Sequence, residues 1–212
     1  MSAMPGIIAN PFGFTRQEIA VLRQLGSPEK IQRFLDEKIL YDPGLSCRSP
    51  RRVLRERRGH CVEGAFLATT ALRLLGHPPL ILDLQAQRDD DHVITLFRRD
   101  GLWGAIGKSN YSGLRYREPV YKSLRELAMS YFEHYFNPRG ERTLRGYSRP
   151  INLSQFDATG WMTAEEDPWQ IPNYLATISH TPLIPRKVVG RLTQLDSRLK
   201  AANEFGMHKK AG

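Results

Sequence analysis

The spacing of apolar residues predicts that the first part of the chain is helical. Three typical helix starts, at which Ser or Thr is followed by proline or by a glutamate three positions later, occur at Thr15, Ser27 and Ser49. From Cys61 onward apolar residues recur at helical spacing up to Gly76, and two prolines follow. We therefore expect several helices, of which an apolar one begins at Cys61.

After residue 79 the pattern changes to that of strands. The segment 80–86 is short and apolar-rich, and over 93–98 a second strand is expected in which Val93, Thr95 and Phe97 alternate with Ile94, Leu96 and Arg98. Asp100-Gly101 is a strong signal for a two-residue hairpin, and it leads into a third strand at 102–106. The sequence thus predicts an α+β fold, in which N-terminal helices and the helix that carries Cys61 pack on a small antiparallel sheet.

The later part of the chain has a weaker pattern. A capping box at Ser123 predicts a helix that continues to about Phe136. Beyond residue 140 prolines divide the sequence into short pieces, and a last helix is expected over 187–204. We therefore expect a core domain over 1–140 and a C-terminal extension over 141–212 that packs on it.

Composition narrows the class of protein. A hydrophobic content of 41% and a charged content of 25% are typical of a globular chain. No segment approaches the roughly 18 consecutive apolar residues of a membrane span, and Met1 to Phe14 lacks the pattern of a signal peptide. Two cysteines are too few for a disulfide scaffold or a Cys-rich zinc site. We expect a reduced, cytoplasmic protein that has no membrane contact.

The net charge of +9 raises the question of an acidic partner. Five arginines gather between residues 51 and 58, and in a helix Arg51, Arg55 and Arg58 would share one face. Such a face can be solvated, or it can meet phosphates or an acidic protein. No aromatic residues interleave with these arginines, so the signal for nucleic-acid binding is weak.

One pair of residues carries the chemistry. Cys61 stands at the start of a helix, where the helix dipole favours thiolate over thiol, and His92 stands at the start of a strand. A thiol and an imidazole are the minimum equipment for nucleophilic attack on an amide. His60 and His77 fit structural roles better. No motif for a metal, a phosphate or a nucleotide cofactor is present, so neither a metal nor a cofactor is expected.

An ordered set of motifs around this pair resembles the transglutaminase-like superfamily. The motifs are Ser49-Pro50-Arg51-Arg52-Val53-Leu54, Gly59-His60-Cys61-Val62-Glu63-Gly64-Ala65, Leu72-Arg73-Leu74-Leu75-Gly76, Asp91-His92-Val93 and Gly101-Leu102-Trp103. The resemblance implies a papain-like core in which Cys61 is the nucleophile and His92 the general base and acid. It covers about residues 27–110.

The third catalytic residue is where the chain departs from this family. The family usually has an aspartate four positions after the tryptophan, where this chain has Gly107. Ser109 has the right parity if the strand continues, and the amide of Asn110 can orient an imidazole if the strand has ended or bulged. Asp90, two positions before His92, is a further candidate.

Two classes of function remain open. The first is acyl transfer at the amide bond of a peptide or protein by a peptidase, an amidase or a transglutaminase-like enzyme. The second is a catalytically weak or inactive module of the same fold, which binds an acidic protein or nucleic acid through its arginines. The missing aspartate at position 107 motivates the second alternative.

Overall fold

The computed structural model describes residues 12–207 and has an α+β fold. The expectation that Met1 to Phe14 is not a signal peptide therefore falls almost entirely outside the described residues. Within residues 12–207, no helix is long and apolar enough to cross a membrane.

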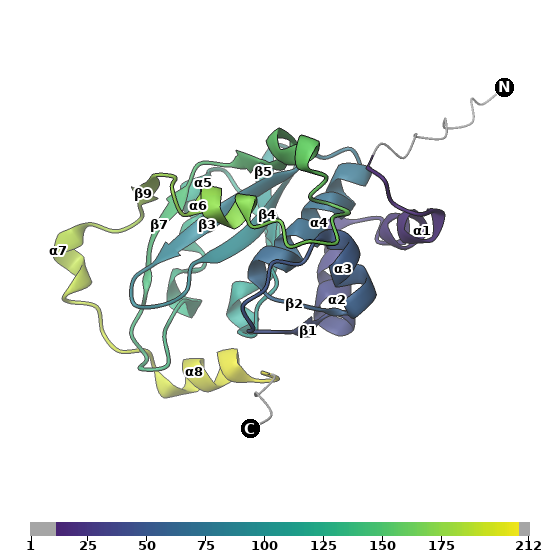
Figure 1. Ribbon diagram of the computed structural model, residues 1–212. Coiled ribbons are helices and arrows are strands. Elements are labelled where there is room, and N and C mark those ends of the chain that lie inside the picture. The colour runs from purple at the N-terminus through teal and green to yellow at the C-terminus, as the bar shows by residue number, and fades with distance from the viewer. Residues whose placement is uncertain (1–11, 208–212) are drawn as a thin grey trace.

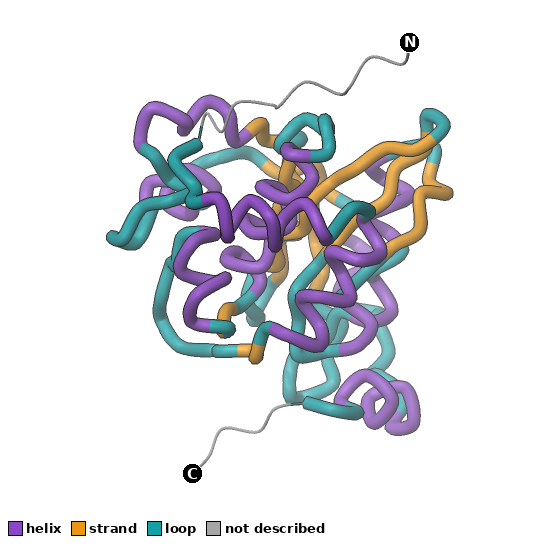
Figure 2. The backbone as a smooth tube through the Cα atoms, turned by 90° about the vertical axis from the view of Figure 1, so that its right-hand side faces the viewer, coloured by secondary structure: helices purple, strands orange, loops and turns teal. Residues whose placement is uncertain are grey.

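Seven antiparallel strands form the main sheet (Figure 2). Their spatial order is β6 (Arg117–Tyr121), β5 (Leu102–Ile106), β4 (His92–Arg99), β3 (Leu80–Ala86), β7 (Leu144–Ser148) and β9 (His180–Pro182), and β8 (Ile151–Asn152) also pairs with β3. The predicted hairpin is confirmed, because Asp100 and Gly101 join β4 to β5 with φ values of 52° and 80°. Such positive values at both positions match the right-handed twist of the two strands.

Helices cover both faces of the sheet. α1 (Arg16–Gln24), α2 (Pro28–Lys38), α3 (Pro50–Glu56) and α4 (Cys61–Leu74) lie on one side (Figure 1), where Ile81, Val93 and Phe97 join their apolar core. The alternate residues of the same strands, such as Leu82 and Ile94, pack with α5 (Leu124–Met129) in a second core. The Thr95 hydroxyl donates to the Ala65 carbonyl at 2.8 Å and fixes β4 against α4.

A short parallel pair of strands precedes the cysteine. β1 (Leu40–Tyr41) pairs with β2 (Arg58–Gly59), in a register that sets Tyr41 opposite Gly59. The arginine-rich helix α3 ends at Glu56, since Arg57 takes a left-handed conformation with φ 55°. The expectation that Arg58 shares a helix face with Arg51 is therefore wrong, because Arg58 belongs to a strand.

The sheet continues past residue 140. β7 and β9 extend it beyond β3, and the Trp161 ring packs edge-on against Phe66 with 5.5 Å between centroids. The helices of this part are α6 (Gln170–Leu175), α7 (Arg186–Val189) and α8 (Ser197–Glu204), and a 3-10 turn covers Leu153–Thr159. Two further 3-10 turns, Ser112–Leu114 and Phe132–His134, lie earlier in the chain.

Two predicted helices are shorter than expected. The one that starts at Ser123 ends at Met129, and a separate 3-10 turn follows it. The helix expected over 187–204 is interrupted after Val189, and a new helix begins because the Asp196 carboxylate accepts the N–H groups of Arg198 and Leu199. α8 lies at one end of the molecule, near the C-terminus (Figures 1 and 2).

Candidate active site

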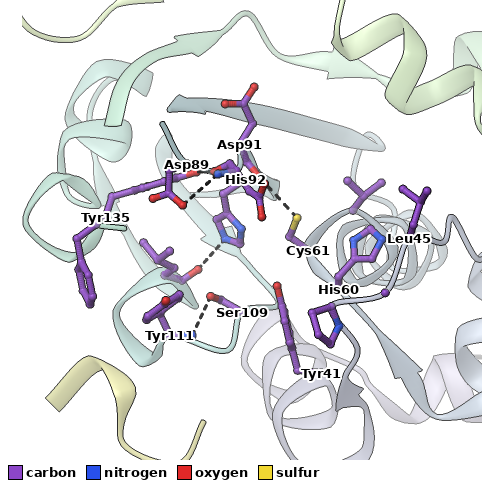
Figure 3. Close-up of a pocket in the computed structure, with 16 residues that line it drawn as sticks. Tyr41, Leu45, His60, Cys61, Asp89, Asp91, His92, Ser109, Tyr111 and Tyr135 are labelled. Atoms are coloured by element: carbon purple, nitrogen blue, oxygen red, sulfur yellow. Dashed lines mark hydrogen bonds between the residues drawn. The ribbon is translucent and has the colours of Figure 1, made fainter. Parts of the chain in front are cut away.

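Cys61 and His92 meet at a cavity of about 430 Å³ (Figure 3). Its walls come from segments far apart in the sequence: Tyr41 of β1, the start of α4, the turn 89–91 before β4, the loop after β5, and Tyr135. The fold therefore brings the predicted nucleophile and the predicted base to one hollow.

Cys61 is the first residue of α4 and is partly accessible. Its sulfur lies 3.9 Å from the carbonyl oxygen of Asp91. Burial would raise the pKa of this thiol, but hydrogen bonds and charge from His60 and His92 outweigh burial and lower the pKa to about 5. The thiolate is then the main form at neutral pH, as a nucleophile requires.

The ring of His92 is held from the side away from the cysteine. His92 is 5% exposed, and its Nε2 lies 2.9 Å from the carbonyl oxygen of Leu114. A carbonyl only accepts, so Nε2 carries a proton and Nδ1 is the nitrogen left for the sulfur. The Tyr135 ring packs edge-on against the imidazole, with 6.5 Å between centroids.

Gly107 explains why a carbonyl can reach this ring. A Cβ atom at position 107 would lie 3.2 Å from Nε2 of His92 and 2.8 Å from the oxygen of Leu114. Position 107 is therefore next to the far ring nitrogen, where the sequence resemblance implies an aspartate. Because glycine has no side chain, the Leu114 carbonyl occupies this space and accepts the hydrogen bond.

The side chains predicted to replace the aspartate have different surroundings. Ser109 is 5% exposed and lines the cavity, and its hydroxyl accepts the N–H of Tyr111 at 3.0 Å. Asn110 is half-buried and is not among the residues that form the cavity wall. Asp90 lies exposed at the rim, where its backbone carbonyl accepts the Tyr135 hydroxyl at 2.6 Å. A catalytic role for Ser109, Asn110 or Asp90 stays a prediction.

His60 has a closer link to the chemistry than the sequence indicated. Its Nε2 lies 2.7 Å from the carbonyl oxygen of Ser46, to which it donates. Burial would lower the pKa of His60, but Cys61, Glu63 and the Ser46 carbonyl raise it to about 9. Two imidazoles therefore flank the sulfur. In the sequence, the one sign of this link is that His60 stands immediately before Cys61.

A buried carboxylate, that of Glu63, supports the turn that carries His60 and Cys61. Glu63 is fully buried and accepts the backbone N–H groups of His60 at 2.9 Å and Arg48 at 2.7 Å. The Arg48 guanidinium forms an ion pair with Glu63 at 3.2 Å. These bonds hold the start of α4 against the preceding loop and so fix the direction in which Cys61 points.

Tyr41 also lines the cavity, although nothing in the sequence indicated a role for it there. Its hydroxyl points toward the space beside Cys61 (Figure 3). Burial and the negative charge of Cys61 raise the pKa of this phenol, so it stays a neutral hydrogen-bond donor. Its register opposite Gly59 keeps it beside the cysteine turn.

The arginines between 51 and 58 are largely engaged within the chain. Arg51 pairs with Glu18, Arg52 with Glu56 and Asp167, Arg55 with Glu165, and Arg58 with Asp42, while Arg57 lies over the Phe34 ring. Each carboxylate offsets the positive charge that this segment would otherwise present to an acidic partner.

Within residues 12–207, no group of three or more His, Cys, Asp or Glu side chains is arranged to hold a metal ion. The chain matches no known protein-family model and no curated protein.

Proposed function

We propose that this protein is a thiol enzyme that transfers acyl groups from amide bonds, on a core of the papain and transglutaminase type. The observation that carries the proposal is the flanked sulfur of Cys61, which faces His92 in a cavity and has a lowered pKa. The oriented imidazole of His92 supports it further, because a fixed base is what a thiol nucleophile requires.

In the first step the Cys61 thiolate attacks the carbonyl carbon of the amide and forms the S–C bond, while the carbonyl π electrons move to oxygen. Backbone N–H groups at the start of α4 have no partner within the helix and can stabilise this oxyanion. The oxyanion then re-forms the C=O bond and expels the amine, and the His92 imidazolium gives its Nδ1 proton to the amine nitrogen as the C–N bond breaks. A thioester on Cys61 and a free amine result.

In the second step neutral His92 takes a proton from the acceptor, which attacks the thioester carbon. The sulfur leaves as thiolate beside a restored imidazolium. With water as the acceptor the enzyme is a peptidase or amidase, and with an amine it is a transglutaminase. Cys61 and His92 would play the same roles with either acceptor.

The alternative of a binding module draws on the arginines between 51 and 58. Their ion pairs with carboxylates of the same chain argue against a free basic surface there. No specific observation favours this alternative over the enzyme.

An activated ester such as p-nitrophenyl acetate tests the proposal. We expect wild type and Cys47→Ala to carry an acetyl group on Cys61 in intact-mass spectra and to release p-nitrophenol beyond one equivalent. Cys61→Ala and His92→Ala should do neither. Cys47 is the matched control, because burial raises its pKa to about 12. Equal acetylation of the Cys61→Ala variant would refute the assignment.

A further inference from the structure

The loop that orients His92 is itself held by the C-terminal helix. Asn203 of α8 accepts the backbone N–H of Gly113 on its Oδ1 at 3.0 Å, and the same oxygen lies 3.2 Å from Nδ1 of His134. The Ser112 hydroxyl donates to the carbonyl of Ala202 at 3.1 Å. α8 thus holds the turn Ser112–Leu114 through one backbone carbonyl, that of Ala202, and one side chain, that of Asn203.

The hydrogen bond from Gly113 to Asn203 is one residue away from the bond between Leu114 and the His92 imidazole. Gly113 precedes Leu114, whose carbonyl oxygen accepts from Nε2 of His92. A side chain at position 113 would overlap Asn203 Oδ1 and the His134 ring, so the close approach requires glycine there. A continuous path of contacts therefore runs from α8 through the turn and His92 to Cys61.

The burial pattern of α8 indicates what the helix is for. Asn203 is its one buried residue and is only 2% exposed. A helix that packs on the hydrophobic core buries apolar side chains. α8 instead buries the amide of Asn203, whose oxygen accepts the N–H of Gly113 in the turn Ser112–Leu114. A buried amide oxygen must be satisfied, so the position of α8 and that of the turn depend on each other.

We propose that Asn203 is a positioning residue for His92, which it serves by fixing the turn that presents the Leu114 carbonyl to the imidazole. This assignment rests on the proposed function. It gives the C-terminal segment a part in catalysis without contact with the substrate.

Other bonds also support the turn, so the expected effect is partial. The Arg117 guanidinium donates to the Gly113 carbonyl at 2.7 Å, and the Tyr131 hydroxyl donates to the Arg115 carbonyl at 3.0 Å. Loss of the Asn203 bond should therefore loosen the Leu114 carbonyl without releasing the whole loop.

The test is the pH midpoint of Cys61 alkylation by iodoacetamide in the full chain. Asn203→Leu keeps the shape and removes the acceptor, and we expect it to raise the midpoint by about one unit, the size expected when one hydrogen bond to a charged group is weakened. Asn203→Asp keeps an acceptor oxygen and should restore the wild-type midpoint. Arg198→Ala, at an exposed position of the same helix, is the control.

Circular dichroism and the melting temperature show whether each variant is folded. If Asn203→Leu does not fold, Ser112→Ala decides, because it removes the second contact with α8 and should raise the midpoint by a smaller amount. A folded variant with the wild-type midpoint would overturn the role of Asn203. A wild-type midpoint near the free thiol value of about 8.5 would instead refute the proposed function.

Discussion

The carbonyl oxygen of Leu114 lies 2.9 Å from Nε2 of His92, in the space beside Gly107 that a side chain would otherwise take. A backbone carbonyl fixes the same tautomer and ring direction as a carboxylate would, but it carries no full charge. It therefore stabilises imidazolium less than an aspartate does, and we expect a modest rate of catalysis.

The first prediction concerns Gly107. In Gly107→Ala the new Cβ would lie 2.8 Å from the Leu114 oxygen and would push this carbonyl away from His92. We expect the Cys61 thiol midpoint to rise by about one unit, because a charge-assisted hydrogen bond to the imidazolium is weakened. The measurement is the rate of alkylation against pH.

Gly190→Ala is the matched control for this substitution, because a Cβ there meets nothing within 4 Å and the backbone is right-handed. Equal midpoints in Gly107→Ala and Gly190→Ala would show that the Leu114 carbonyl does not support the imidazole.

The second prediction concerns His60, whose pKa is raised to about 9. His60→Asn removes one of the two hydrogen-bond donors to the sulfur, so the Cys61 thiol pKa should move up from about 5 toward its free value. His77→Asn, in the loop after the C-terminal end of α4, should leave the Cys61 pKa unchanged. If the two variants titrate alike, His60 is only structural.

The third prediction concerns the stability of the cysteine turn. Glu63→Ala removes a fully buried carboxylate and leaves Arg48 without one of its partners. We expect a loss of about 3–5 kcal/mol in the free energy of unfolding, measured by urea denaturation. Glu133→Ala breaks an ion pair whose carboxylate is largely exposed and should cost under about 1 kcal/mol. Similar losses in both variants would contradict the supporting role of Glu63.

Much of the secondary structure could be read from local signals. The caps at Thr15, Ser27 and Ser49 start helices as predicted, and Asp100-Gly101 forms its hairpin. Such features depend on a few neighbouring residues, so the sequence contains them directly.

The partner of His92 could not be read in the same way. It is a backbone carbonyl, which every residue has, and its position depends on a turn that α8 holds from the other end of the sequence. The single helix expected over 187–204 is likewise divided in the structure, because α7 ends at Val189 and α8 starts only at the cap Asp196. Side-chain patterns do not show which carbonyl the fold will bring to a ring.

The central claim is that Cys61 and His92 form a reactive pair, and the pH dependence of Cys61 alkylation tests it most directly. A lowered thiol pKa means that thiolate is present above that pH, so the rate should rise through a midpoint of about 5 and stay high at neutral pH. His92→Ala should move the midpoint up. A wild-type midpoint at or above about 8.5, unchanged in His92→Ala, would contradict the account.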